Sequence, residues 1–210
     1  MALVIEAVLR LRQDSPDVSL FPLVADVEAV PELAALLAAQ APPAGRRLLA
    51  CFGLLPNLDY GTFLPALRRL LRPGDWLLLS ANLSPQPYPD ACPAILPQYD
   101  NPLAHAWFLG LLDSLGVPPR HAELRVTAQP LRVDGHIWQI RAVAVFCRPT
   151  TLTLYGESFA FAAGERVQLF FSTRFTPEAV PEVLAAAGLP VVAAWVFAGQ
   201  EEGLYLCTPG

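Results

Sequence analysis

The sequence predicts an α/β protein. Its first eighty residues alternate amphipathic helical stretches with short apolar runs, which is the pattern of a parallel sheet joined by crossover helices. From about residue 122 to residue 172 the apolar side chains recur with period two, which is typical of antiparallel strands. Hydrophobic residues make up 54% of the 210 residues and charged residues 16%. The chain can therefore bury a sizeable core, and intrinsic disorder is excluded.

The first half is expected to form three strands and three helices. Each predicted helix shows apolar residues on one face, and each predicted strand is a short apolar run that stops at a polar residue. In chain order we expect a helix around residues 4–9, a strand at Val18–Val24, a helix at Val30–Leu37, a strand at Leu48–Phe52, a helix at 63–71 and a strand at Trp76–Ala81. Right-handed crossovers bring the carboxyl ends of parallel strands to one edge, so Asp26, Asn57 and Asn82 should lie along one rim.

The second half changes pattern after a proline-rich loop at 83–101. A helix over Leu103–Gly116 should carry Trp107 in the core, and Trp138 should be a core residue of the strands that follow. The expected strands are Leu124–Val126, Ile137–Cys147, Thr151–Phe161 and Arg166–Ser172, followed by a helix after Pro177 and a hairpin of Val191–Phe197 with Leu204–Cys207. The predicted organisation is a partial core at 1–82, an inserted subdomain at 83–175, and a last helix and hairpin at 176–210 that complete the core.

Composition excludes several kinds of function. The net charge of −5 disfavours a nucleic-acid surface, and because all 14 basic residues are arginine there is no P-loop lysine or Schiff-base lysine. His105, His121 and His136 lack metal-ligand spacing, so no metal site is expected. The four cysteines are expected to be buried, inert thiols. Neither a signal peptide nor a membrane span is recognisable, so we expect a cytoplasmic protein with no membrane partner.

Several motifs resemble one known family. The run from Cys51 to Leu58, Cys-Phe-Gly-Leu-Leu-Pro-Asn-Leu, resembles the Phe-Leu-Gly-Ser-x-x-Gly-Asn-hydrophobic motif of the histidine-specific methyltransferases. That family includes the S-adenosylmethionine-dependent enzyme that trimethylates the histidine amino group in ergothioneine synthesis. Further resemblances follow the family's order at Val24–Asp26, Leu71–Leu79, Gln98–Asn101, Phe161–Glu165 and Ser172–Phe175. The resemblance covers nearly the whole chain and implies a Rossmann-like class I methyltransferase sheet with an inserted antiparallel α+β substrate subdomain.

The resemblance also implies site residues. Asn57 and Tyr99 match residues that hold the amino and carboxylate groups of the substrate, and Phe170 and Ser172 match residues that reach its side chain. For the cofactor, S-adenosylmethionine, Asp26 matches a residue beside the adenine, and Gly53 allows close approach at a strand end. A catalytic acid or base is not implied, because the sulfonium is already an activated methyl donor. Structural roles stay open as well: an Asx turn for Asn57, a helix N-cap for Asp26 and a tight turn for Gly53.

The sequence departs from the family pattern at several positions. It contains no Gly-x-Gly, so the glycine-rich cofactor loop has no counterpart, and the resemblance is to the C-terminal portion of the family, a truncated sheet. The family's glutamate two residues before the matching serine is Phe170 here, its lysine is Arg174 and its aspartate after the third strand is Asn82. Because a phenyl ring cannot accept a hydrogen bond from an imidazole N–H, we expect an amino-acid-like amine other than histidine as substrate.

Two functions remain open from the sequence. The chain could be a methyltransferase whose missing loop comes from a partner chain, from a second copy in a homodimer, or from an unusual closure of its own. Alternatively, it could be a catalytically degenerate methyltransferase-like module that dimerises or binds a partner, because a sheet without its central strands has unpaired edges. A misassigned start or a fragment would explain the missing half in either case.

Overall fold

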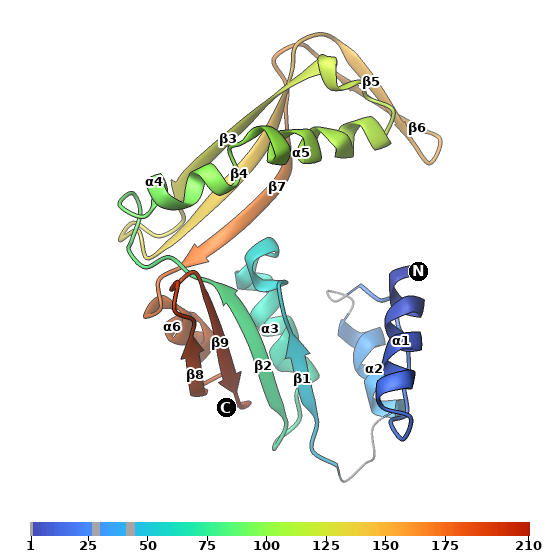
Figure 1. Cartoon of the computed structure of the whole chain (residues 1–210), viewed down its shortest axis with the longest axis vertical. Helices are drawn as coiled ribbons and strands as arrows, with labels where there is room; N and C mark the ends of the chain where they lie inside the picture. The colour runs from blue at the N-terminus through green and yellow to red at the C-terminus, as the bar shows by residue number, and fades with distance from the viewer. Residues whose placement is uncertain (1, 27–29, 41–44) are drawn as a thin grey trace. The chain divides into compact units, whose positions relative to one another are not determined.

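The computed structural model describes residues 2–26, 30–40 and 45–210 (Figure 1). The chain divides into two compact units, residues 1–45 and residues 46–210. The first unit contains helices α1 (Ala2–Asp14) and α2 (Val30–Gln40), close to where periodicity predicts them. Pro31 lies in the first turn of α2, where its missing N–H costs no helical hydrogen bond.

The strand predicted at Val18–Val24 is wrong. The described residues between α1 and α2 form no strand, and the side chains of Val18, Phe21 and Val24 are exposed. An extended segment becomes a strand only where another strand satisfies its backbone groups. The first unit offers only two helices in its described part, so this apolar run has nothing to pair with there.

The second unit contains a four-stranded sheet of order β1-β2-β9-β8 (Figure 1). Its strands are β1 (Leu48–Cys51), β2 (Trp76–Asn82), β8 (Val191–Val196) and β9 (Glu202–Cys207). The strands β1 and β2 are parallel, and β9 is antiparallel to both of its neighbours. The β8–β9 hairpin predicted at the end of the chain is therefore part of this sheet.

Helices connect and cover these strands. The crossover from β1 to β2 runs through a 3₁₀ turn, η1 (Leu55–Asn57), and helix α3 (Tyr60–Leu70), and α6 (Ala179–Ala186) precedes β8. The carboxylate of Asp59 caps α3 by accepting from the backbone N–H groups of Gly61 and Thr62. The side chains of Leu77 and Leu79 in β2 are fully buried, as are those of Phe63 and Leu64 in α3.

An antiparallel sheet is inserted between β2 and α6. It has the order β3-β4-β7, with β3 at Ala122–Pro130, β4 at Ile137–Phe146 and β7 at Arg166–Phe175. One face is covered by α4 (Cys92–Ile95), the 3₁₀ turn η2 (Leu96–Gln98) and α5 (Pro102–Ser114) (Figure 1). A third 3₁₀ turn, η3 (Pro119–His121), precedes β3. The architecture is α/β with an antiparallel insertion, as the sequence predicts, while the three predicted domain boundaries stay predictions.

Two further expectations for this insertion are wrong. The single strand predicted at Thr151–Phe161 is a hairpin of β5 (Thr150–Leu154) and β6 (Glu157–Phe161). Its turn lies at Tyr155 and Gly156, with φ of 50° and 85°, the left-handed pair that tight hairpins require. Trp138 is fully buried as predicted, but Trp107 is not a core residue, since 69% of its surface is exposed.

The C-terminal end of β2 meets the C-terminal end of β7. Leu83 forms an isolated parallel bridge with Phe175, and the Ser84 N–H donates to the Phe175 carbonyl at 2.8 Å. The four-stranded sheet is thus joined by backbone to the antiparallel sheet. This junction places Asn82, the last residue of β2, next to β7.

Candidate substrate-binding site

Every second residue along the end of strand β7 lies on the same face of the sheet. Phe170, Ser172 and Arg174 lie opposite Ala142, Ile140 and Trp138 of β4 in the register of the pair. Trp138 and Ile140 pack with the residues of α4 and η2, so this face looks toward the covering helices. The predicted pair Phe170 and Ser172 therefore shares a face, because side chains alternate along a strand.

The hydroxyl of Ser172 joins two segments distant in sequence. Its Oγ accepts a hydrogen bond from Asn82 Nδ2 at 3.3 Å and another from the Tyr99 hydroxyl at 3.4 Å. Tyr99 Oη in turn accepts from Arg174 Nη2 at 2.8 Å. Predicted substrate residues Tyr99 and Ser172 are thus in contact. Sequence reasoning did not include Asn82 and Arg174 among the site residues, although both positions depart from the family pattern.

Arg174 is a buried cation, with only 4% of its surface exposed. Its Nη1 donates to the Leu83 carbonyl at 3.2 Å, and its guanidinium carbon lies 5.6 Å from the centroid of the Tyr99 ring. Its Nε has no hydrogen-bond partner, and no carboxylate in the described part of the chain forms an ion pair with it. A carbonyl, a phenol and an aromatic face therefore provide its stabilisation.

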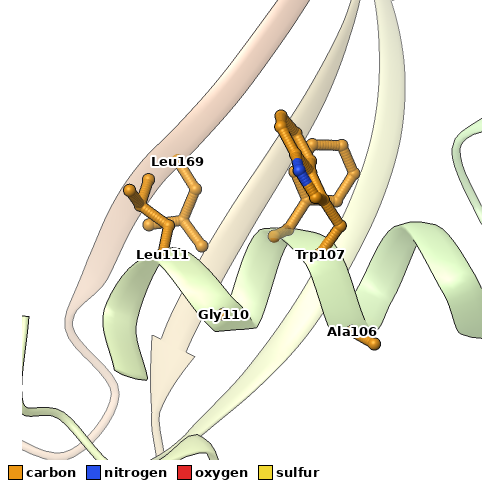
Figure 2. Close-up of a pocket in the computed structure, with 6 residues that line it drawn as sticks. Ala106, Trp107, Gly110, Leu111 and Leu169 are labelled. Atoms are coloured by element: carbon orange, nitrogen blue, oxygen red, sulfur yellow. The ribbon is translucent and has the colours of Figure 1, made fainter. Parts of the chain in front are cut away.

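Phe170 supplies an apolar wall beside these polar groups. Its ring stacks on that of Tyr99 at a centroid distance of 5.8 Å and contacts the ring of Phe108 at 5.0 Å. The Trp107 ring lies edge-on to Phe170 at 6.3 Å. This cluster continues into a groove of about 510 Å³ along α5, lined by Ala106, Trp107, Phe108, Gly110, Leu111 and Leu169 (Figure 2).

Asn57 and Gly53 are brought together after β1. The Asn57 side chain is exposed, and its Nδ2 donates to the Gly53 carbonyl at 3.1 Å. Gly53 has a φ of 70°, and its N–H donates to Ser80 Oγ at 2.8 Å. The Asn57 amide therefore has a local role in the loop, while its Oδ1 has no partner among the described residues. The structure records no contact between Asn57 and Ser172 or Tyr99.

Asp26 belongs to the first unit, where it is exposed. Its predicted place on a rim shared with Asn57 and Asn82 stays a prediction, because these two residues lie in the second unit. Within the described residues, the side chains of His, Cys, Asp and Glu do not gather into a group that could hold a metal ion. Among the described helices, none has both the length and the apolar character that crossing a membrane requires.

A second cavity lies on the other face of β7. It measures about 250 Å³ and its lining includes Tyr60, Gln139, Arg141 and Thr173. The side chains of Gln139, Arg141 and Thr173 are linked by hydrogen bonds, from Arg141 Nε to Gln139 Oε1 at 2.5 Å and from Gln139 Nε2 to Thr173 Oγ1 at 3.3 Å. Sequence reasoning missed this cavity, since no motif marks residues gathered from α3, β4 and β7.

Comparison with known proteins gives a partial match to one family. The model of the histidine-specific, S-adenosylmethionine-dependent methyltransferases matches residues 131–209. This segment includes Phe170, Ser172 and Arg174, and excludes Gly53, Asn57 and Tyr99. None of the curated proteins compared with the chain matches it.

Solved structures show only distant similarity. An S-adenosylmethionine-dependent methyltransferase from Clostridium acetobutylicum is 12% identical over 100% of this chain and 72% of its own, with a TM-score of 0.41. The sugar N-methyltransferase KedS8 from Streptoalloteichus is 15% identical over 97% of this chain and 75% of its own, with a TM-score of 0.37. The glycopeptide N-methyltransferase MtfA is 14% identical over 90% of this chain and 60% of its own, with a TM-score of 0.35.

The chain thus spans 60–75% of the length of these three proteins. All three TM-scores lie below 0.5, so these likenesses identify neither a shared site nor a shared substrate. The family match rests on sequence and falls on the segment that carries β4 to β9. The resemblance predicted from the motifs, to the histidine-specific, S-adenosylmethionine-dependent methyltransferase family, is therefore confirmed for this part of the chain.

Proposed function

We propose that this chain transfers a methyl group from S-adenosylmethionine to the amine of an amino-acid-like substrate other than histidine. The observation that carries this proposal is the contact of Tyr99 with Ser172, beside Phe170. Two residues that match substrate positions of the family through the resemblance meet although 73 positions separate them. Phe170 stands where the family has glutamate, which removes the acceptor for an imidazole N–H.

The residues after β1 leave room for the methyl donor. Gly53 has open space where a side chain would begin, and its φ of 70° lies in the left-handed region just after β1. This supports Gly53 as a position where a ligand approaches the backbone, with Asp26 beside the adenine as the predicted second contact. When bound, S-adenosylmethionine supplies an electrophilic methyl group whose bond to sulfur breaks as the bond to nitrogen forms.

The chain's own residues then have to position the acceptor. Asn57 and Tyr99 would orient its amino and carboxylate groups, and Phe170 would contact its side chain. Holding a neutral amine in line with the methyl group provides most of the rate enhancement, since well-oriented reactants gain several kcal/mol, about 7 or more, over free ones. This role requires no metal ion and no covalent intermediate.

Calorimetric titration of the 210-residue chain with S-adenosylmethionine and S-adenosylhomocysteine tests the proposal. Micromolar binding of both supports it, and amino acids are then titrated into the complex with S-adenosylhomocysteine. The Asn57→Ala variant should bind the cofactor with unchanged affinity and should no longer bind the amino acid. Absence of heat with both cofactor forms at high concentration would contradict methyl transfer by this chain alone.

A second function, partner binding by a catalytically inactive module, is favoured by the edge of the sheet. Strand β1 is one of the two edge strands of this sheet, and the side chains of Leu48 in it and of Phe52 directly after it are 61% and 54% exposed. An exposed apolar edge strand is a template for pairing with another chain. Sedimentation velocity should then show a dimer that Leu48→Lys dissociates. A monomer at every concentration would exclude self-association through this edge.

A further inference from the structure

The cavity on the other face of β7 lies within the second unit. Strands β4 and β7 contribute Gln139, Arg141 and Thr173 to its lining, and the start of α3 borders it as well. Side chains alternate along a strand, so Thr173 faces away from the side of the sheet that carries Ser172. The volume of about 250 Å³ is below the range of about 300–1,000 Å³ that is usual for drug-sized ligands, so the cavity has the size for a small metabolite.

The hydrogen bonds in this cavity have a fixed direction. A guanidinium can only donate, so the side-chain oxygen of Gln139 must face Arg141 Nε, at 2.5 Å. The amide nitrogen of Gln139 then donates to Thr173 Oγ1 at 3.3 Å. The Thr173 hydroxyl therefore accepts in this contact, and its own proton has no acceptor within the described ranges. Because Thr173 is 1% exposed, a ligand in the cavity is the natural acceptor.

Arg141 has hydrogen-bond donors left for a ligand. A guanidinium carries five N–H groups, and Gln139 uses one of them. In the amide orientation that satisfies both groups, the side-chain oxygen of Gln129 takes one more from Nη1 at 3.1 Å and one from Nη2 at 3.0 Å. Two N–H groups remain, and no carboxylate in the described part of the chain forms an ion pair with Arg141. The cavity is thus lined by a cation whose charge is not neutralised.

A carboxylate lines the same cavity without pairing with this cation. Asp59 uses Oδ1 to cap α3, and its Oδ2 makes neither a hydrogen bond nor an ion pair with any described residue. A ligand that carries a carboxylate and an ammonium group can therefore lie between Arg141 and Asp59 and pair with both. Burial raises the pKa of the neighbouring Tyr60 hydroxyl above its ordinary value, so Tyr60 keeps its proton and adds another donor to the lining.

We propose that this cavity binds a small α-amino acid as a zwitterion, with its carboxylate on Arg141 and Thr173 and its ammonium group on Asp59. A ligand with only a negative charge would lie beside Asp59 without a compensating charge, and a ligand with only a positive charge would lie beside Arg141 in the same way. The ligand's side chain is apolar, because the rest of the lining includes Leu58, Leu131 and Phe171. This site is separate from the proposed substrate residues, and it does not depend on methyl transfer.

Leucine and its two single-charge analogues provide the test. Isocaproate lacks the ammonium group of leucine, and isoamylamine lacks its carboxylate, while both keep the apolar part. Calorimetry on the full chain without S-adenosylmethionine should show leucine binding about tenfold or more tighter than either analogue. Equal affinities for the three compounds, or the absence of heat with leucine, valine and methionine, would overturn the inference.

Two variants assign the two charges of the ligand. The Arg141→Gln variant should bind leucine and isoamylamine with equal affinity, because the group that recognises the carboxylate is gone. Asp59→Asn keeps an oxygen to cap α3 and removes only the charge, so leucine and isocaproate should bind equally. Arg125→Gln is the matched control: this exposed arginine lies on the same face of the sheet but not in the cavity lining, so all affinities should be unchanged. A preference for leucine that survives in both Arg141→Gln and Asp59→Asn would overturn the inference.

Failure of the inference differs from failure of the proposed function. Leucine binding that Tyr99→Phe weakens and Arg141→Gln leaves unchanged would place the amino acid at the proposed substrate residues, which contradicts the inference and supports the function. Leucine binding that Arg141→Gln weakens, in a chain that binds no S-adenosylhomocysteine, would support the inference and contradict the function.

Discussion

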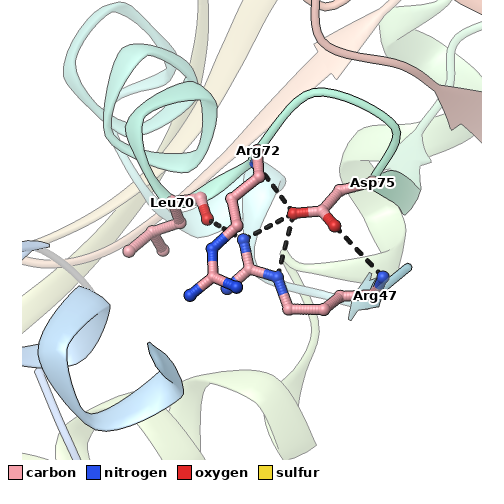
Figure 3. A network of polar contacts seen from close by, with 4 residues as sticks. All are labelled: Arg47, Leu70, Arg72 and Asp75. Atoms are coloured by element: carbon pink, nitrogen blue, oxygen red, sulfur yellow. Dashed lines mark hydrogen bonds and ion pairs between the residues drawn. The ribbon is translucent and has the colours of Figure 1, made fainter. Parts of the chain in front are cut away.

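Asp75 binds Arg47 across 28 residues through two side-chain hydrogen bonds, 2.9 Å to Nε and 2.5 Å to Nη2 (Figure 3). The carboxylate also accepts from the backbone N–H groups of Arg47 at 3.1 Å and Arg72 at 2.7 Å. Arg47 Nη2 in turn donates to the Leu70 carbonyl near the end of α3. Gly74, with a φ of 85°, turns the chain so that Asp75 faces inward. Through these contacts the turn at Pro73, Gly74 and Asp75 connects the end of α3 to the starts of β1 and β2.

Replacing Asp75 should destabilise the second unit strongly. Asp75 is 2% exposed and the Arg47 side chain 12%, so Asp75→Ala leaves a largely buried cation without its partner. Breaking such a pair costs about 3 kcal/mol or more. Urea denaturation should show this loss, whereas Glu182→Ala, at the exposed end of the Arg132–Glu182 pair, should leave the transition unchanged. Equal effects of the two substitutions would contradict the assignment.

Stability should fall in acid as Asp75 is protonated. Burial alone would raise the pKa of the Asp75 carboxyl, but hydrogen bonds from the Arg47 side chain and from the backbone of Arg72 and Arg47 lower it below its ordinary value. A lowered folded-state pKa stabilises the fold above the unfolded pKa, and this contribution disappears as the pH falls through the folded value. The difference in unfolding free energy between the wild type and Asp75→Asn should have its largest value at neutral pH and should decrease below pH about 4. Denaturation curves at several pH values measure this, and a constant difference would count against it.

Gly53→Ala should destabilise the loop after β1. The φ of 70° at Gly53 lies in the left-handed region, which costs a residue with a side chain about 1 kcal/mol. Gly110→Ala is the matched control, because Gly110 lies in α5 with open space around it. The control should gain about 0.5–1 kcal/mol through helix propensity. Opposite changes in the melting temperature of the two variants are the expected result, and a gain in both would show that Gly53 tolerates a side chain.

Asn57→Ala should separate function from stability. The side chain is exposed and makes one hydrogen bond, to the Gly53 carbonyl, so the melting temperature should change little. If Asn57 orients the substrate amine, methyl transfer from labelled S-adenosylmethionine should be abolished. Unchanged turnover would remove Asn57 from the substrate site and leave it the role of an Asx-type loop residue.

Thiol labelling should distinguish the four cysteines. Burial raises the pKa of the Cys51 and Cys207 thiols to about 11, whereas Cys147 is exposed. The buried pair flanks β2, opposite Leu79 and Leu77. Iodoacetamide at pH 8 should modify Cys147 first, and mass spectrometry of peptides identifies the site. Rapid modification of Cys51 would contradict the packing of β1 on β2. The sequence-based expectation of four buried thiols is wrong for Cys147, which is exposed, and Cys92 is only half-buried.

Local patterns were informative wherever neighbouring residues decide the outcome. Helix α3, strand β2 and the last hairpin follow the predicted periodicity, and the motif order pointed to the family match at residues 131–209. Patterns failed where strand pairing or the surrounding elements decide the outcome. The run Val18–Val24 has no strand to join in the described part of its unit, and Trp107 is 69% exposed although its helix is apolar. Apolar character says that a residue can be buried, but not that another element covers it.

Residue spacing along one strand was enough to place Phe170 and Ser172 on a common face, because side-chain alternation is a property of the strand itself. The contact of Ser172 with Tyr99 and Asn82, and the burial of Arg174, depend on β2 and β7 meeting at their ends. These groups come from segments about 70 to 90 residues apart. Hydrogen bonds between such distant groups form only after the sheets have assembled, so the tertiary structure alone decides that Ser172, Tyr99, Asn82 and Arg174 meet.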